Sequence, residues 1–223
     1  MLALAAAPAR AAEVPPDPAQ PVDSPPHLLL IHGGSFLFED PLFEPLTAAP
    51  ALAAGFVPHY VEYPLDNLPA AVLAVRAAAR ELRAQVGREV YAYGASAGGT
   101  LAALLAGDGL VAAAAAKAPP TDLVGWDWPL TAYGPDYYEQ IGADTAARYR
   151  LSPLRRSARR PLLVVQGRLD RVVPLTMSEA YDDKFTRVHL WAVPGGHHTE
   201  RARPWVLERT LRWLGDIAHT GTS

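Results

Sequence analysis

The sequence predicts an α/β fold, a three-layer α/β/α sandwich built on a mostly parallel six-stranded sheet. Short apolar runs alternate with longer amphipathic or Ala-rich segments over most of the chain. This alternation is typical of parallel sheets that are covered by helices on both faces. The length of 223 residues, half of them hydrophobic, suits a single domain with a large core.

The expected strands are short apolar runs that end at Gly, Pro or polar turn residues. They cover residues 27–32, 57–63, 89–93, 111–117, 162–166 and 188–192. The expected helices lie between and after these strands, at residues 42–54, 70–86, 97–106, 175–186 and 203–218. In the helix at 70–86 the larger apolar residues fall mostly on one side and the arginines on another. This helix should therefore lie half-exposed on the sheet.

The first 26 residues differ from the rest and are expected to form a disordered or extended leader with a Pro-rich arm. The apolar run at 2–7 precedes an A-x-A site at 9–11, which resembles the end of a secretory signal, but a basic segment is missing. Two interpretations stay open: a secreted protein whose start lies upstream, or a cytoplasmic protein with an Ala-rich leader. The folded domain is expected to span residues 27–223.

Composition and charge exclude several classes of function. The formal net charge is -3, and acidic and basic residues are mixed along the chain, so no extended basic surface indicates nucleic acid or an anionic membrane as partner. No apolar run approaches the roughly 20 residues of a membrane-spanning helix. The absence of cysteine excludes disulfides, a thiol nucleophile and cysteine-ligated metal sites. The expected partner is a small molecule, and the oligomeric state stays open.

A candidate nucleophile, Ser96, lies where an apolar strand passes into a helical segment. The motif Gly94-Ala95-Ser96-Ala97-Gly98 has the form of a nucleophile elbow, in which small residues allow a sharp turn that exposes the serine hydroxyl. The alternative is a small-residue turn where a helix and a strand pack closely.

A candidate acid and a candidate base follow two later strands. Asp170 comes after the apolar run at 162–166 and a Gly turn, and His197 comes after the run at 188–192 and a Gly pair. Catalytic groups of open α/β sheets collect at the carboxyl ends of strands, so both could reach Ser96. His198 could be the base instead of His197. The acid could also be one of two other aspartates that follow the fourth expected strand, Asp122 and Asp127.

The order Ser, Asp, His along the chain resembles that of the α/β-hydrolase superfamily. In this family a Gly-then-His turn usually carries the base and a Gly-x-x-Asp turn the acid, which favours His197 and Asp170. The motif His32-Gly33-Gly34-Ser35-Phe36 resembles the HGGG-type oxyanion loop of esterases and lipases, with Ser35 in place of the third Gly. The resemblance implies oxyanion donors at the backbone amides of Gly33, Gly34 and Ala97.

The implied fold is a reduced one. Typical α/β-hydrolases begin with an antiparallel strand pair, and only the unpatterned arm precedes residue 27 here. We therefore expect about six parallel strands in the spatial order 2-1-3-4-5-6, joined by right-handed crossovers.

A long segment at about 119–160 interrupts the alternation and contains six large aromatic residues: Trp126, Trp128, Tyr133, Tyr137, Tyr138 and Tyr149. Such insertions are often lids or binding loops, and the alternative is a locally packed insertion whose aromatics only attach it to the body. The candidate pocket residues are Ser35, Trp126, Trp128 and Tyr133.

The expected function is that of a serine esterase that cleaves a carboxylic ester through an acyl-enzyme, with no metal or organic cofactor. The motifs also resemble those of kynurenine formamidases, dienelactone hydrolases and prolyl-oligopeptidase-type peptidases. An arylformamidase, another amide or peptide hydrolase, or an acyltransferase could use the same residues. A non-catalytic binding module that keeps the pocket is the alternative from another class.

Overall fold

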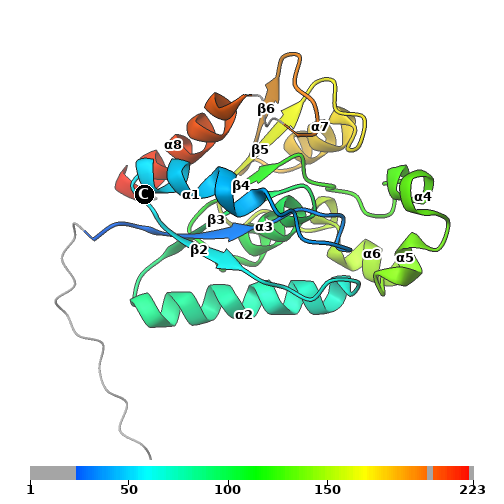
Figure 1. The fold of residues 1–223 in the computed structure, drawn as a ribbon, viewed down its shortest axis with the longest axis horizontal. Helices are drawn as coiled ribbons and strands as arrows, with labels where there is room; N and C mark the ends of the chain where they lie inside the picture. The colour runs from blue at the N-terminus through cyan, green and yellow to red at the C-terminus, as the bar shows by residue number, and fades with distance from the viewer. Residues whose placement is uncertain (1–23, 200–202, 221–223) are drawn as a thin grey trace, which may run out of the picture.

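The computed structural model describes residues 24–199 and 203–220, and its centre is a six-stranded sheet. The strands are β1 (His27–Ile31), β2 (Val57–Val61), β3 (Val90–Ala95), β4 (Ala114–Lys117), β5 (Leu162–Gly167) and β6 (Val188–Val193). All neighbours pair in parallel, in the order β2-β1-β3-β4-β5-β6 (Figure 1). The predicted fold class and strand order are confirmed. Most of the expected leader, residues 1–23, lies outside the described residues.

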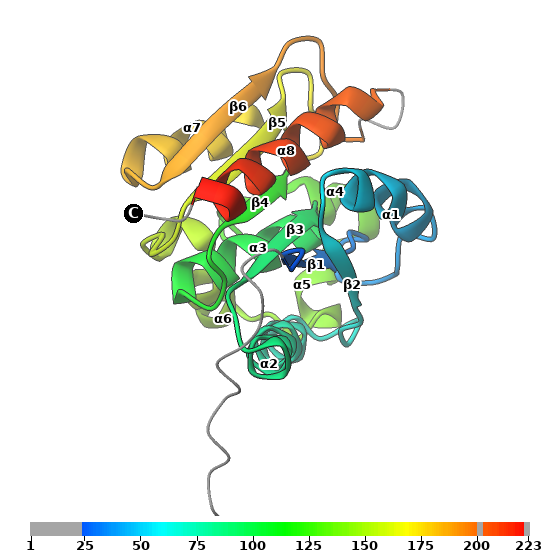
Figure 2. The ribbon, with the colours of Figure 1, turned by 90° about the vertical axis from the view of Figure 1, so that its left-hand side faces the viewer.

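Helices cover both faces of the sheet. They are α1 (Phe43–Ala53), α2 (Leu68–Val86), α3 (Ala97–Asp108), α4 (Trp128–Tyr133), α5 (Tyr137–Gln140), α6 (Thr145–Leu151), α7 (Leu175–Lys184) and α8 (Pro204–Thr220), with a 3₁₀ turn at Pro153–Arg155. Side chains alternate along each strand, so Leu28 and Leu30 pack with α1 and α8, whereas Leu29 and Ile31 pack with α2 and α3. Figure 2 shows α1 and α8 on the opposite side of the sheet from α2.

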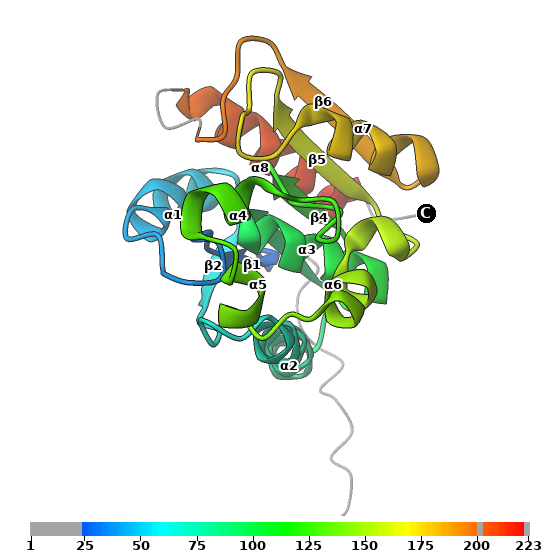
Figure 3. The same cartoon turned by 90° about the vertical axis from the view of Figure 1, so that its right-hand side faces the viewer.

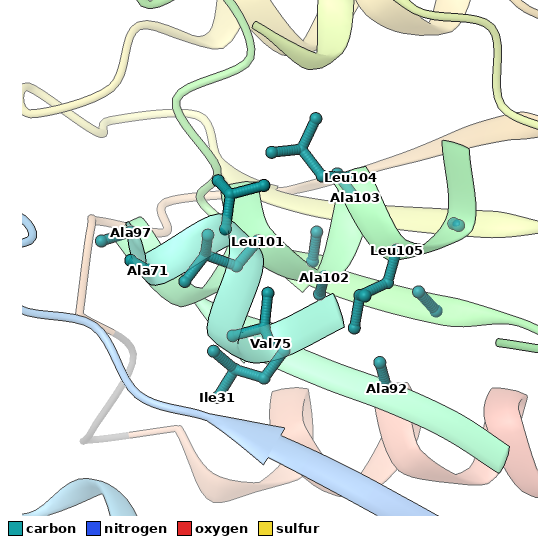
Figure 4. Close-up of a cluster of buried hydrophobic side chains, with 14 of the residues drawn as sticks. Ile31, Ala71, Val75, Ala92, Ala97, Leu101, Ala102, Ala103, Leu104 and Leu105 are labelled. Carbon is teal, nitrogen blue, oxygen red and sulfur yellow. The ribbon is translucent and has the colours of Figure 1, made fainter. Parts of the chain in front are cut away.

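Helix α3 forms the centre of the larger core. Its Leu101, Leu104 and Leu105 are at most 1% exposed, and Figure 4 shows Leu101 between this helix and Val75 of α2, with Ile31 of β1 nearby. A helix that is apolar on all sides is stable only when it is surrounded by other elements. The candidate nucleophile directly precedes this helix, so it is attached to one of the best packed parts of the molecule.

Several boundaries differ from the predicted ones by a few residues. Helix α2 begins at Leu68 because the side chain of Asn67 caps it, accepting a hydrogen bond from the amide of Ala70 at 3.0 Å. Helix α3 continues to Asp108 and ends at Gly109, whose φ of 75° is left-handed. The fourth strand is shorter than predicted, since pairing begins only at Ala114.

The segment at 119–160 contains α4, α5 and α6 and lies in front of the sheet in Figure 3, at its carboxyl edge. Its aromatic side chains pack against one another: Trp126 and Tyr137 are fully buried, and their rings meet edge to face. Trp126 also stacks on Trp128. The buried aromatics of the segment thus join the larger core and cover the strand ends. Among the described helices, none has the length and apolarity to cross a membrane.

Candidate active site

Ser96 occupies a strained turn between β3 and α3. Its φ of 54° and ψ of -119° lie in a region that residues with a side chain seldom adopt. The turn is possible because residues 94 and 98 are glycines without a Cβ. A Cβ on Gly94 would collide with the carbonyl of Gly98, and a Cβ on Gly98 would collide with the carbonyl of Ile31. The amide of Ser96 donates to the carbonyl of Lys117 at 2.7 Å, which fastens the turn to β4.

The imidazole of His198 lies between Ser96 and Asp170. Its Nε2 is 3.0 Å from Ser96 Oγ, and its Nδ1 is 2.9 Å from Asp170 Oδ2. The side chain of His198 is only 18% exposed. A hydroxyl, an imidazole and a carboxylate in series form an arrangement in which the ring can accept the hydroxyl proton while the carboxylate orients it.

The prediction of His197 for this position is wrong, since its side chain is exposed to solvent. The reason is the packing of the turn that precedes it. A Cβ on Gly167 would lie 2.5 Å from Gly196 and 2.6 Å from the carbonyl oxygen of His197, so these backbones touch. The carbonyl of Gly196 also accepts a hydrogen bond from Leu169 at 2.7 Å. This contact fixes the chain direction so that the first histidine faces outward and the second faces Ser96.

Asp170 is buried, and both of its carboxylate oxygens have two donors. Oδ1 accepts from the amides of Val172 at 2.8 Å and Val173 at 3.0 Å. Oδ2 accepts from Nε2 of Gln166 at 2.7 Å and faces His198. Burial alone would raise the pKa of Asp170, but the hydrogen bond and charge of His198, together with the two amides, hold this pKa below its usual value. Asp170 is therefore held as a carboxylate.

The alternative aspartates lie elsewhere. Asp122 accepts from the amide of Val124 at 3.2 Å and pairs with Arg155 at 3.6 Å. Asp127 directly precedes α4 in the insertion. The ring of His198 is hydrogen-bonded to Asp170, which accepts from Nδ1–H, and to the hydroxyl of Ser96.

Two further polar residues support this arrangement and were missed in the sequence. Gln166 is fully buried on β5 and also binds the carbonyl of Val173 and the hydroxyl of Ser178. Lys117, at the end of β4, donates from Nζ to the carbonyl of His198 at 2.5 Å. The available signal was a polar side chain at the end of an otherwise apolar strand, which is rarely buried without a partner.

The loop after β1 has three consecutive residues with positive φ: Gly34 at 118°, Ser35 at 54° and Phe36 at 60°. Contacts from other segments hold it. The hydroxyl of Tyr137 donates to the carbonyl of Ser35 at 2.8 Å, and the hydroxyls of Tyr133 and Ser35 share a hydrogen bond of 3.1 Å. The insertion therefore supports the loop directly.

The same loop lies against the elbow. A Cβ on Gly33 would be 2.9 Å from the carbonyl oxygen of Ala95 and 3.3 Å from Cβ of Ser96. Ala97 begins α3, and the first amides of a helix have no acceptor within the helix. The loop and the helix start thus bring the three predicted oxyanion positions to the neighbourhood of Ser96.

A cavity of about 460 Å³ opens above these residues. Its lining includes Gly33, Gly34, Ser96 and His198, together with the predicted pocket residues Ser35, Trp128 and Tyr133. The fourth predicted pocket residue, Trp126, is not part of this lining. Its ring is fully buried, and its Nε1 donates to the carbonyl of Val172 at 2.8 Å, so it supports the cavity from behind.

The lining also includes residues of α1 and of the start of α8 that the sequence did not indicate: Leu42, Leu46, Pro50, Pro204 and Leu207. Within the described ranges, no group of three or more His, Cys, Asp or Glu side chains could hold a metal ion.

Solved structures with the same fold are numerous. A propionate-bound esterase 2 from Thermogutta terrifontis is 21% identical, with a TM-score of 0.69 over 92% of this chain and 87% of that chain. A bifunctional acetyl ester-xyloside hydrolase from Caldicellulosiruptor lactoaceticus is 15% identical, with a TM-score of 0.70 over 91% and 85%. An esterase/lipase from an uncultured bacterium is 21% identical, with a TM-score of 0.72 over 89% and 77%. At these identities the likeness shows the fold.

The sequence comparisons place the chain more narrowly. The search of curated protein sequences gives no match. The model of the prolyl oligopeptidase family matches residues 67–219, well over half of the chain. The matched part contains Ser96, Asp170 and His198. This chain therefore belongs to the prolyl oligopeptidase family, whose members are serine hydrolases.

Proposed function

We propose that the protein hydrolyses carboxylic esters of small molecules through an acyl-enzyme on Ser96. The observation that carries this proposal is the position of His198, within hydrogen-bonding distance of both Ser96 Oγ and Asp170 Oδ2. These three groups are the nucleophile, the general base and the carboxylate of a serine hydrolase.

In the first half of the reaction, Ser96 Oγ attacks the ester carbonyl carbon while His198 Nε2 takes the hydroxyl proton. Asp170 holds Nδ1–H and stabilises the imidazolium that forms. The carbonyl oxygen becomes an oxyanion, and His198 then donates its proton to the leaving alcohol as the C–O bond breaks. The products of this half are the free alcohol and an ester between the acyl group and Ser96.

In the second half, water takes the place of the alcohol. His198 Nε2 removes a proton from a water molecule, the resulting hydroxide attacks the acyl carbon, and the proton returns to Ser96 Oγ as the acid leaves. Asp170 suits this cycle because its pKa is held low, so that it stays a carboxylate while the imidazole gains and loses a proton.

The oxyanion is assigned to backbone amides of Gly33, Gly34 and Ala97. This assignment is supported by the contact between Gly33 and the turn at Ser96 and by the position of Ala97 at the start of α3. Amides that are already aimed at the developing charge stabilise it without reorganisation, and one such donor is commonly worth about 10²-fold in rate.

The neighbours favour an ester over an amide as substrate. Two of them are described as esterases, one of these with propionate bound, and a third acts on acetyl esters according to its description. The family to which the chain belongs also takes its name from oligopeptidases. Amide hydrolysis on the same residues is therefore the second candidate, and acyl transfer differs from hydrolysis only in the nucleophile that resolves the acyl-enzyme.

The test combines turnover with active-site labelling. Wild-type protein should hydrolyse p-nitrophenyl acetate faster than the matching anilide, and a fluorophosphonate probe should label Ser96, as located by peptide mass spectrometry. Ser96→Ala should lose both signals. Ser157→Ala removes an exposed serine outside the cavity and should keep both. Turnover by Ser96→Ala at the wild-type rate would contradict the proposal, and faster anilide cleavage would favour the amide candidate.

A further inference from the structure

The cavity extends beyond the reacting groups into a region between α1 and α8, which we call the aliphatic arm. It is lined by Leu42, Leu46, Pro50, Pro204 and Leu207. The two helices are in contact and lie side by side in Figure 1. Tyr93 and Ala95 of β3, directly before Ser96, line the same cavity. The arm is thus continuous with the nucleophile.

The polar side chains near this arm are engaged with the protein. The hydroxyl of Thr47 donates to the carbonyl of Phe43 at 2.7 Å and shares a hydrogen bond with Tyr60 at 3.1 Å. The guanidinium of Arg203 donates to the carbonyls of Pro194 at 2.9 Å and Gly195 at 2.8 Å. The lining is therefore mainly aliphatic and suits a chain that needs no hydrogen bonds.

The length of the aliphatic arm can be estimated from the spacing of its lining residues along α1. Leu42, Leu46 and Pro50 are four residues apart, so they share one face of the helix. Eight residues of helix rise about 12 Å, which gives room for an extended chain of about eight carbons, roughly 9 Å between its end atoms plus about 2 Å for the terminal methyl. Leu42 and Leu46 are each 44% exposed, so one side of the arm is open and a bound chain would be covered in part.

The lining of the same cavity has a second, aromatic part. Phe38, Trp128, Tyr133 and Val172 belong to it, and the amide of Val172 donates to Asp170. In the acyl-enzyme the acyl chain is bonded to Ser96 Oγ, and Tyr93 and Ala95 of β3, the strand that leads into Ser96, line the cavity together with the aliphatic arm. The acyl chain can therefore extend from Ser96 into the aliphatic arm.

We propose that the preferred substrates are esters of unbranched aliphatic acids of about six to eight carbons, with the acyl chain in the aliphatic arm. This inference rests on the proposed ester hydrolysis and narrows its substrate class. Each methylene that enters the arm loses contact with water, and full burial of one methylene favours binding by about fourfold. Because the arm covers a bound chain only in part, the expected gain in kcat/KM is about two- to fourfold per methylene.

The test measures kcat/KM for p-nitrophenyl esters from acetate to palmitate. The expected result is a rise of about two- to fourfold per methylene up to about octanoate, and no further gain beyond it. Leu46→Trp should fill the arm and lower the ratio of octanoate to acetate activity at least about tenfold. Leu52→Trp is the matched control, because Leu52 is on the same helix, is 61% exposed and lies outside the lining; it should keep the wild-type ratio.

Several outcomes would overturn the inference, and they differ from failure of ester hydrolysis itself. A kcat/KM that is flat or falls from acetate onward, or an unchanged ratio in Leu46→Trp, would mean that the acyl chain does not enter the arm. A rise with the alcohol length of alkyl acetates instead would assign the arm to the alcohol. If Leu46→Trp does not fold, as judged by circular dichroism, Leu207→Phe repeats the test from α8. Absence of turnover on every ester, together with absence of fluorophosphonate labelling, would reject the proposed function instead.

Discussion

Replacement of Asp170 by asparagine should strongly lower both the stability and the activity of the protein, because each carboxylate oxygen faces two N–H donors. Oδ1 accepts from Val172 and Val173, and Oδ2 accepts from Gln166 and faces His198 Nδ1. An asparagine amide must place its NH₂ on one side or the other. In either orientation the NH₂ meets donors, and these donors lose their acceptor.

The size of the effect follows from these contacts. A buried donor without a partner costs about 1–3 kcal/mol, so Asp170→Asn should lower the free energy of unfolding by about 2–3 kcal/mol. The wrong tautomer of His198 should lower kcat by about 10³- to 10⁴-fold, as in other serine hydrolases with this change.

The assay is urea unfolding at neutral pH together with steady-state hydrolysis of p-nitrophenyl acetate. Asp122→Asn is the control, since Asp122 pairs with Arg155 and lies outside the His198 hydrogen bonds. A kcat for Asp170→Asn within about tenfold of wild type, or an equal loss in Asp122→Asn, would refute the assignment of the acid.

Three further changes test the supporting contacts. Tyr137→Phe leaves the buried carbonyl of Ser35 without its donor, so it should lower the free energy of unfolding by about 1–3 kcal/mol and kcat by about tenfold, measured in the same two assays. Lys117→Met removes the donor to the His198 carbonyl and should lower kcat by about tenfold with little change in KM, with partial recovery in Lys117→Arg; a wild-type kcat would contradict this role. Because the folded pKa of Asp170 lies below its usual value of 3.8, its contribution to stability is complete above that value and is lost as pH falls through the folded pKa. The difference in unfolding free energy between wild type and Asp170→Asn should therefore stay constant near neutral pH and shrink as pH falls below the usual pKa of 3.8.

The fold was predictable because the signals for it are local. Alternating apolar runs and helical segments specify strands and covering helices. Once their order along the chain is known, right-handed crossover connections allow only a few sheet topologies. The boundaries that moved did so through single contacts, such as the cap on α2 by Asn67. Those contacts are short-range, and a closer inspection of capping residues would have placed that helix start.

The choice between His197 and His198 could not be made from the sequence in the same way. The direction of each side chain depends on how Gly196 packs against Gly167, a contact between the turn after β6 and the end of β5, which are separate in the sequence. Trp126 is a similar case, because its place behind the cavity depends on its hydrogen bond to the carbonyl of Val172. Long-range packing decided both, and neither residue type nor spacing encodes it.

His198 is proposed as the base that activates Ser96, and the adjacent His197 provides a matched control for a test of this role. The measurement is the kcat/KM of His198→Ala and His197→Ala for p-nitrophenyl acetate, with circular dichroism to confirm the fold of both. His198→Ala should lose about 10⁴-fold or more, whereas His197→Ala changes an exposed side chain and should stay within about twofold of wild type. The reverse ranking, or equal losses in the two variants, would contradict the assignment of His198 as the base.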